Sequence, residues 1–301
     1  MRTPAGVALL LALVAAPGCR DTRGQAARQV DANALAEREA RLAQSLARGD
    51  SAVDRDAPLA RWVLPSALAE ISGIALTPDG RLLAHNDETG RVFEIDYRRG
   101  VVVKQFLLGK QVVHDDFEGI TTAGDRIFLL ASGGKIYEFK EGKEGQAVPF
   151  TITDSRLGRE CEFEGVAFDP AINSLLMACK HVGLKSLRDF VVIYRWNLSD
   201  TGQSRLTQLR IPMAEVIGTN EWKHFTPSDI SVDPSTGNYV LVASQERGLV
   251  TVTPAGAVVS SRSLPTTHDM AEGLAITKDS ILIVSDEMVR RPATITLYRW
   301  R

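Results

Sequence analysis

The chain has 301 residues, of which 44% are hydrophobic and 24% are charged, and its formal net charge is −2. These values are typical of a globular protein with enough apolar residues to build a core. Because no excess of basic residues is present to attract phosphate backbones, nucleic acid is excluded as a partner.

The first residues have the pattern of an export leader. A short positive start is followed by an apolar run from Ala5 to Ala16, which is too short to span a bilayer and has the length of a secretory signal. The tetrapeptide Ala16-Pro17-Gly18-Cys19 resembles a bacterial lipobox, although Ala16 stands where that pattern prefers leucine. We therefore expect residues 1–18 to be a lipoprotein signal peptide. The alternative is an ordinary cleaved signal followed by a coincidental cysteine.

A lipobox implies that lipid is attached to the sulfur of Cys19, and hence that a lipid bilayer is a partner. Residue 20 is Arg rather than the Asp that favours retention in the inner membrane. The expected location is therefore the cell envelope, with the anchor in the outer membrane and the folded part in the periplasm or at the cell surface.

Residues 19–60 are expected to form a tether that contains one amphipathic helix. The segment Asp31–Arg48 is rich in Ala, Leu, Arg and Glu. Within it, Leu35, Leu42 and Leu46 follow one another at spacings of seven and four, which places them on one helix face. A spacer is the expected role of this helix, and binding to a partner is the alternative.

From residue 61 the sequence changes to short β-type runs separated by turn residues, which indicates an all-β fold. One motif recurs five times, and its copies start 46, 46, 64 and 44 positions apart. The copies are Ser72-Gly73-Ile74-Ala75, Glu118-Gly119-Ile120-Thr121, Glu164-Gly165-Val166-Ala167, Ser228-Asp229-Ile230-Ser231 and Glu272-Gly273-Leu274-Ala275. We call the first residue of each copy the signature residue. Each copy is followed by a turn and two further apolar runs, and a period of about 45 residues with three or four strands is typical of a β-propeller blade.

These repeats predict a five-bladed β-propeller over residues 61–301, with blades that start near residues 70, 116, 162, 226 and 270. The one longer interval fits inserted loops within Lys180–Asp189 and Ala214–Phe225. The last repeat supplies only three strands before the sequence stops. We expect Arg61–Leu64 to add the fourth strand and so to close the ring without an exposed sheet edge.

Two cysteines remain in the predicted propeller if Cys19 carries lipid. Cys161 and Cys179 flank a predicted hairpin whose turn lies near Asp169–Asn173, so they should be near neighbours across its two strands. Either they form a disulfide, as an oxidising compartment allows, or they are two small buried hydrophobic residues.

The motifs resemble those of the SdiA-regulated, or YjiK-like, family over roughly residues 61–301. The segments that carry the resemblance are Glu70–Ala75, Asp116–Ile120, Phe163–Ala167, Ala271–Ala275 and Ile283–Glu287. The resemblance implies a five-bladed propeller behind an N-terminal membrane anchor, a calcium site, and a biochemical role that is largely unassigned. More distant similarity links the chain to esterase-like or phytase-like propellers, to NHL-type propellers, and to the lactonase and strictosidine-synthase group.

The signature residues open the first strand of each blade, and in a propeller that strand lines the central channel. We therefore expect Glu118, Glu164 and Glu272 to converge near the axis, with Ser72 and Ser228 completing the ring and Asp229 one residue further on. Three adjacent carboxylates repel one another unless one is protonated or a cation lies between them. Oxygen ligands in a wide ring favour calcium over magnesium, so these four acidic residues are the expected metal ligands. The alternatives are an acidic mouth filled with water, or glutamate side chains that form hydrogen bonds to neighbouring strand ends.

Further polar residues are predicted at the same end of the channel. His114, His268 and His224 each stand four residues before a signature residue, where they would be candidate general bases or ordinary polar loop residues. The ends of the second strands add Asp87, Glu246 and Glu287 as candidate ligand contacts. Lys180 is the one cation predicted among these carboxylates, and a salt bridge is its expected role.

Two function hypotheses follow from these residues. The first is a non-enzymatic envelope module that binds a small molecule or a protein, with calcium at its axis. The second is a calcium-dependent hydrolase of esters, lactones or phosphoesters, with His114 or His268 as the base. No nucleophile elbow, zinc-peptidase motif, phosphate loop or dinucleotide fingerprint is present in the sequence to favour the second.

Overall fold

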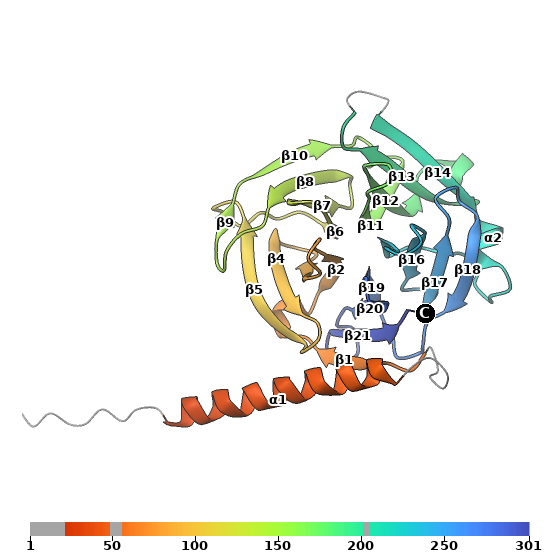
Figure 1. Ribbon diagram of the computed structural model, residues 1–301. Helices are drawn as coiled ribbons and strands as arrows, with labels where there is room; N and C mark the ends of the chain where they lie inside the picture. Colours follow the sequence, from red (N-terminus) through yellow and green to blue (C-terminus); the bar gives the residue numbers. More distant parts are fainter. Residues whose placement is uncertain (1–21, 49–55, 201–204, 301) are drawn as a thin grey trace, which may run out of the picture.

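The computed structural model describes residues 22–48, 56–200 and 205–300, together with the side chains from residue 32 onward. The predicted signal peptide and Cys19 lie outside the described residues. Five antiparallel sheets surround a central channel (Figure 1), which confirms the prediction of an all-β, five-bladed propeller. In the described part of the chain, no helix is both long enough and apolar enough to cross a bilayer.

Each blade starts with a strand at the channel and adds strands outward. Blade 1 contains β2 (Ile71–Leu76), β3 (Leu82–Asn86), β4 (Arg91–Asp96), β5 (Val101–Leu108) and, parallel to β5, the short β9 (Ala147–Val148). Blade 2 contains β6 (Phe117–Ala123), β7 (Arg126–Ala131), β8 (Lys135–Lys140) and β10 (Phe150–Asp154). Blade 3 contains β11 (Cys161–Asp169), β12 (Ser174–Val182), β13 (Phe190–Asn197) and β14 (Leu206–Pro212). Blade 4 contains β15 (Asp229–Val232), β16 (Tyr239–Ala243), β17 (Gly248–Val252) and β18 (Val258–Ser263).

Blade 5 combines strands from the two ends of the propeller sequence. It contains β19 (Ala271–Ile276), β20 (Ile281–Asp286), β21 (Thr294–Arg299) and, as its outermost strand, β1 (Ala60–Val63). β1 runs antiparallel to β21, with Trp62 opposite Ile295. β1 therefore covers the edge of β21, which would otherwise be free to pair with another chain.

Short helical segments lie in the connections between strands. The 3-10 helix η2 (Ser66–Leu68) links β1 to β2, and the 3-10 helix η3 (Lys185–Leu187) links β12 to β13. The single-turn α-helix α2 (Met213–Ile217) follows β14. The last two segments occupy the parts of the sequence where the longest repeat interval predicted inserted loops.

One hydrophobic cluster fills the space between each pair of neighbouring blades. β3 shows how one strand serves two of these clusters: Leu82 and Ala84 pack toward blade 5, whereas Leu83 packs toward blade 2. Because both of its faces are buried, a strand such as β3 reads as a nearly continuous apolar run rather than as an alternation of apolar and polar residues. All three of these side chains are fully buried.

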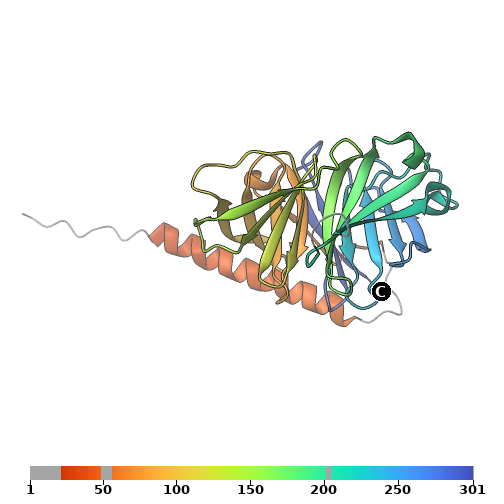
Figure 2. The same cartoon turned by 90° about the horizontal axis from the view of Figure 1, so that it is seen from above.

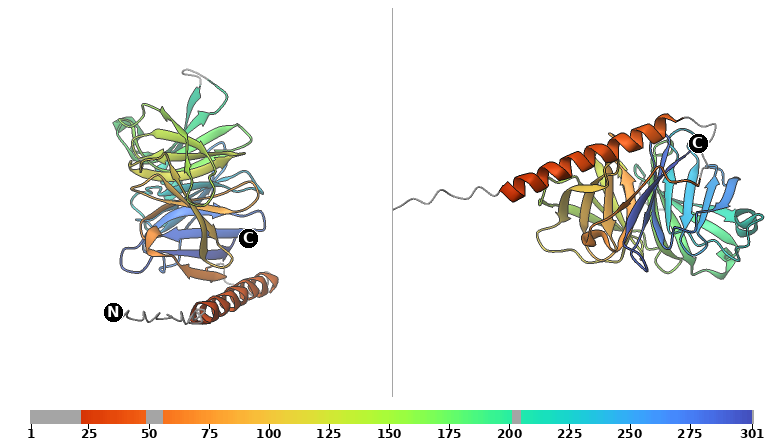
Figure 3. Two further views of the ribbon diagram at one scale, coloured as in Figure 1. Left: turned by 90° about the vertical axis from the view of Figure 1, so that its left-hand side faces the viewer. Right: turned by 90° about the horizontal axis from the view of Figure 1, so that it is seen from below.

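The N-terminal helix α1 (Thr22–Ala47) begins nine residues earlier than the sequence pattern predicted and lies along one side of the ring (Figures 2 and 3). Leu42 is buried in the cluster between blades 5 and 1, and Leu46 packs against it. Arg299 of β21 donates hydrogen bonds to the carbonyls of Ser45 and Leu46, each at 3.1 Å. The described part of α1 is thus docked on the propeller rather than extended away from it.

The five inner strands β2, β6, β11, β15 and β19 form a closed ring of neighbours around the channel. In four of the five copies the second residue of the motif is glycine, and in two of them the next blade leaves no room for a side chain. A β-carbon at Gly119 would lie 2.7 Å from the backbone nitrogen of Val166 on β11, and one at Gly165 would lie 2.6 Å from the Cα atom of Asp229 on β15. In these two copies the glycine is therefore required by the approach of the next blade.

Replacing Gly119 by Ala should destabilise the whole ring, because the added methyl group collides with the backbone of the neighbouring inner strand. We expect a loss of about 1–3 kcal/mol in the free energy of unfolding, as for other overpacked sites. Gly133→Ala is the matched control, because a β-carbon there meets no atom within 4 Å. Urea unfolding measures both variants, and an equal effect of the two substitutions would contradict the steric explanation.

Candidate functional site

In four of the five blades the signature residue lies at an irregularity in the pairing of the inner strand. The pairing of β2 with β3 shifts between Ile71 and Gly73, and the same shift occurs around Glu118 in blade 2 and Glu272 in blade 5. In β11 the irregularity covers Glu164 and Gly165. A bulge leaves its extra residue out of the strand ladder and turns that side chain in a new direction.

The three glutamates gather around one lysine, and we call Glu118, Glu164, Glu272 and Lys180 the acidic cluster. The Nζ atom of Lys180 lies 2.6 Å from Oε1 of Glu164. Ser72 donates a hydrogen bond of 3.0 Å to Oε2 of Glu118, which also interacts with Glu164 and Lys180. Glu272 interacts electrostatically with Glu164 and Lys180. The structure thus brings together three of the four carboxylates that the sequence placed at the axis.

A disulfide lies beside this ion pair. Cys161 on β11 and Cys179 on β12 are bonded, with their Cα atoms 5.6 Å apart. The same two strands carry Glu164 and Lys180. The covalent link therefore holds together the hairpin that presents the pair.

Burial controls the protonation of the acidic cluster. It raises the pKa of Glu118, and the negative charge of Glu164 adds to the shift. Burial and the charge of Glu164 together raise the pKa of Glu272 to about 8. Burial also raises the pKa of Glu164, although the ammonium group of Lys180 opposes the shift. The acidic cluster contains one ammonium group and three carboxyl groups. At neutral pH a proton on Glu272 makes the net charge of the cluster less negative.

More carboxylates surround the cluster toward the solvent. Burial raises the pKa of Asp87, and repulsion from Glu70 and Glu88 adds to it. Burial likewise raises the pKa of Glu287, helped by the charges of Asp87 and Glu70. Asp87 and Glu287 were predicted as contacts at the rim, whereas Glu70 belongs to one of the segments that carry the family resemblance. This end of the channel is therefore acidic from its mouth to its first layer of side chains.

Three other predicted site residues hold the strands together. Burial raises the pKa of Asp229, and the charges of Glu272 and Glu164 add to the shift, so this residue also lies near the acidic cluster. Asp229 is buried, and its carboxylate accepts hydrogen bonds from the backbone N–H groups of Ile230 at 2.8 Å and Leu274 at 2.7 Å, which links β15 to β19. Ser228 donates to the carbonyl of Ala271 at 2.5 Å across the same two blades. Glu246 accepts hydrogen bonds from Thr226. The sequence could not show this, because the same residue types can either tie strands together or bind a ligand.

The predicted histidines do not join the acidic cluster. His268 is fully buried: its Nδ1 atom forms a hydrogen bond of 2.8 Å with Asp286, and its Nε2 atom forms one of 2.7 Å with the hydroxyl group of Tyr298. His114 is exposed before β6 and forms an isolated β-bridge with Thr89. His224 is also exposed. His268 therefore has no free ring nitrogen for proton transfer.

The carboxyl groups of the acidic cluster suit calcium in kind, since they offer oxygen ligands. Their arrangement as it stands is that of an ion pair with Lys180. Within the described residues, no group of three or more His, Cys, Asp or Glu side chains is placed to hold a metal ion. The ammonium group of Lys180 lies among the carboxyl groups instead, and Asp229 is turned to the backbone. The calcium site therefore stays a prediction.

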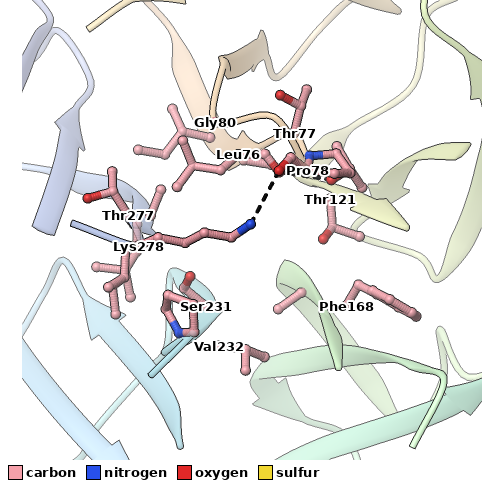
Figure 4. A pocket seen from close by; sticks show the side chains of 18 of the residues that line it. Leu76, Thr77, Pro78, Gly80, Thr121, Phe168, Ser231, Val232, Thr277 and Lys278 are labelled. Carbon is pink, nitrogen blue, oxygen red and sulfur yellow. Dashed lines mark hydrogen bonds between the residues drawn. The ribbon is translucent and has the colours of Figure 1, made fainter. Parts of the chain in front are cut away.

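The other end of the channel holds a cavity of about 770 Å³, which the sequence did not lead us to expect (Figure 4). It is lined by the third and fourth residues of each motif copy and by the turns at the ends of the inner strands. One feature of the sequence could have indicated this cavity, because the fourth residue of every motif copy is small. These five residues are Ala75, Thr121, Ala167, Ser231 and Ala275, and all of them line the cavity.

The sequence is similar to one known family. A family model described as SdiA-regulated matches residues 51–287. No curated protein matches the sequence significantly.

Three solved structures are similar in fold. Glutaminyl cyclase from Myxococcus xanthus has a TM-score of 0.55 at 11% identity, over 80% of this chain and 94% of its own. A luciferin-regenerating enzyme has a TM-score of 0.52 at 8% identity, over 80% and 95%. The PQQ-bound aldose sugar dehydrogenase of Streptomyces coelicolor has a TM-score of 0.50 at 13% identity, over 79% and 98%. At these identities the similarity concerns the fold alone.

Removing the lysine of the cluster should destabilise the protein in a pH-dependent way. Lys180→Met leaves Glu164 buried without its cation, so we expect a loss of about 2 kcal/mol at pH 8, less than the roughly 3–5 kcal/mol of a fully buried pair. The loss should shrink as the pH falls toward 4, because Glu164 then takes up a proton. Lys140→Met, which breaks an exposed pair with Asp125, is the control and should change little. Urea unfolding in chelator at several pH values tests this, and a pH-independent loss would contradict it.

Glu272→Gln should remove a loss of stability that the wild type suffers at high pH. The pKa of Glu272 is raised to about 8 from 4.5, so its contribution to stability is present below pH 4.5 and is lost as the pH rises to 8. Glutamine imitates the protonated acid, so the variant should match the wild type at pH 5 and exceed it at pH 9 by about 2–4 kcal/mol. The measurement is urea unfolding in chelator, with the exposed Glu215→Gln as control. A variant less stable than the wild type at pH 9 would show that Glu272 works as an ionised group.

Proposed function

This chain belongs to the SdiA-regulated family, and we propose that it is a non-enzymatic binding module that takes a cation at the acidic end of its channel. The observation that carries the proposal is the acidic cluster. Three buried or half-buried carboxyl groups there have one ammonium group among them. A group of like charges of this kind is stabilised when a cation binds between the carboxylates and displaces the protons that keep them neutral.

The surroundings of the cluster support the same proposal. The charge of Glu70 adds to the raised pKa of Asp87, and the charges of Asp87 and Glu70 add to the raised pKa of Glu287, so these three carboxyl groups lie close together. A channel lined by one sign of charge with apolar walls attracts ligands of the opposite sign and raises their local concentration. The cation can be calcium, as the sequence and the family resemblance predict, or the ammonium group of an organic ligand or protein partner. Calcium can bind only if the ammonium group of Lys180 moves away from Glu164. The ammonium group of a ligand can bind beside Lys180, with the pair of Lys180 and Glu164 unchanged.

The hydrolase alternative receives less support from the geometry. General base catalysis needs a free base within hydrogen-bond reach of the water that it activates. His268 has both ring nitrogens engaged and is buried. The remaining candidate, His114, is exposed and is not part of the acidic cluster. Binding without turnover is therefore the function that we favour.

We place the module in the cell envelope, held on the outer membrane through lipid on Cys19. The leader pattern of residues 1–18 supports export. The disulfide between Cys161 and Cys179 supports an oxidising compartment, because disulfides persist there and are rare in the cytosol. A small molecule or another envelope protein is the ligand that this location offers.

Calorimetric titration tests the cation site. Chelator-treated protein is titrated with calcium, magnesium and 1,4-diaminobutane, and we expect calcium or the diamine to bind better than magnesium. Glu272→Gln should weaken that binding at least about tenfold, the effect of losing one charge-assisted contact. Lys180→Met should strengthen calcium binding, because the competing ammonium group is gone.

The matched control is Glu215→Gln, a substitution of an exposed residue on α2 at the outer rim. It should leave every affinity unchanged. Absence of binding by both calcium and the diamine up to about 5 mM, where binding would be weaker than −3 kcal/mol, would overturn the proposal. Turnover of a lactone or phosphoester panel that is lost in Glu164→Gln would instead favour the hydrolase.

A further inference from the structure

The cavity opposite the acidic cluster has the size and walls of a small-molecule site. Its volume of about 770 Å³ lies within the range of roughly 300–1,000 Å³ that is usual for ligand pockets. It exists because the third residue after each signature residue is small, so the five inner strands leave space at that level. The turns that follow these strands form its mouth, as Figure 4 shows for Pro78, Gly80 and Lys278.

The inner walls of the cavity are mainly apolar. The fourth residue after each signature residue lines it, and four of these five residues are the apolar Leu76, Phe168, Val232 and Ile276. Hydroxyl groups of Thr121 and Ser231 lie among them (Figure 4). An apolar wall with a few hydroxyl groups accepts a mainly hydrocarbon body and fixes its orientation by a small number of hydrogen bonds.

One positive charge at this cavity is not balanced by a carboxylate. Four charged residues line the cavity. Arg98 pairs with Asp279 at 2.7 Å, and Asp79 pairs with Arg81 at 2.8 Å. The fourth, Lys278, extends across the cavity from blade 5 and donates only a long hydrogen bond of 3.4 Å to the carbonyl of Pro78 in blade 1 (Figure 4). Among the described residues, no carboxylate forms a salt bridge with it.

From this geometry we propose that the cavity is a second binding site, for a small organic anion with an apolar body, and that Lys278 binds the anionic group. A carboxylate at the mouth replaces the long bond to the Pro78 carbonyl by a charge-assisted hydrogen bond, which is the stronger contact. The apolar body then lies against Leu76, Phe168 and Val232. The site is independent of the acidic cluster, because its charge is of the opposite sign and it opens at the opposite end of the channel.

Calorimetric titration of the purified full chain with decanoate tests the site, with decanol as the uncharged probe of equal length. Decanoate should bind at least about tenfold more tightly than decanol, the difference expected for one charge-assisted contact. Lys278→Met should weaken decanoate at least tenfold and leave decanol within about twofold, whereas Lys278→Arg should restore decanoate binding. Ser231→Phe, which fills the cavity, should abolish the binding of both probes.

Two controls separate this site from the rest of the molecule. Lys143→Met removes an exposed lysine at the outer edge of the ring and should leave decanoate binding unchanged. Glu272→Gln, which should weaken cation binding, should also leave it unchanged, so the two proposals can fail separately. No binding of decanoate up to about 1 mM, or equal affinities in the wild type, Lys278→Met and Ser231→Phe, would overturn the proposal.

Discussion

The rest of the structure depends on how closely the five inner strands approach one another at the axis. At Gly119 and Gly165 the backbone of the next blade lies where a side chain would begin, so the ring closes only with glycine there. An irregularity of the strand pairing lies at the same place. The residue before each of these glycines leaves the strand ladder there, and its side chain is directed to the end of the channel. The glycine of the motif and the glutamate beside it thus lie where the inner strands come closest and where their pairing is interrupted.

Periodic features were readable from the sequence, whereas features that depend on a single side-chain orientation were not. The repeat interval predicted five blades, and the motif placed Glu118, Glu164 and Glu272 at one end of the channel. The sequence did not distinguish Asp229, whose oxygens accept two backbone hydrogen bonds, from the glutamates that face the cluster. Nor did it show that His268 is buried between an aspartate and a tyrosine, because Tyr298 lies thirty positions away in the chain. The cavity went unseen for a different reason: its signal is a row of small residues, which is also what ordinary strand packing requires.

The two ends of the channel differ in chemistry although the same five strands build both. At the start of these strands, partly buried carboxyl groups outnumber the one ammonium group. At their ends, small and apolar residues open a cavity under one lysine. Between the two lie the buried residues Ile74, Ile120, Val166, Ile230 and Leu274, one from each blade. A propeller of this length can therefore carry opposite charges at its two mouths without bringing them into contact.

The position of β1 bears on the order in which the protein is made. β1 is synthesised before any other strand of the ring, yet its partner β21 (Thr294–Arg299) is made after all the others. While the four intervening blades are being synthesised, β1 has no β21 to pair with. A chain that is interrupted before Thr294 lacks β21, so the ring can close only after that strand has been made. Synthesis of the whole span from β1 to β21 is in this way a condition for closing the ring.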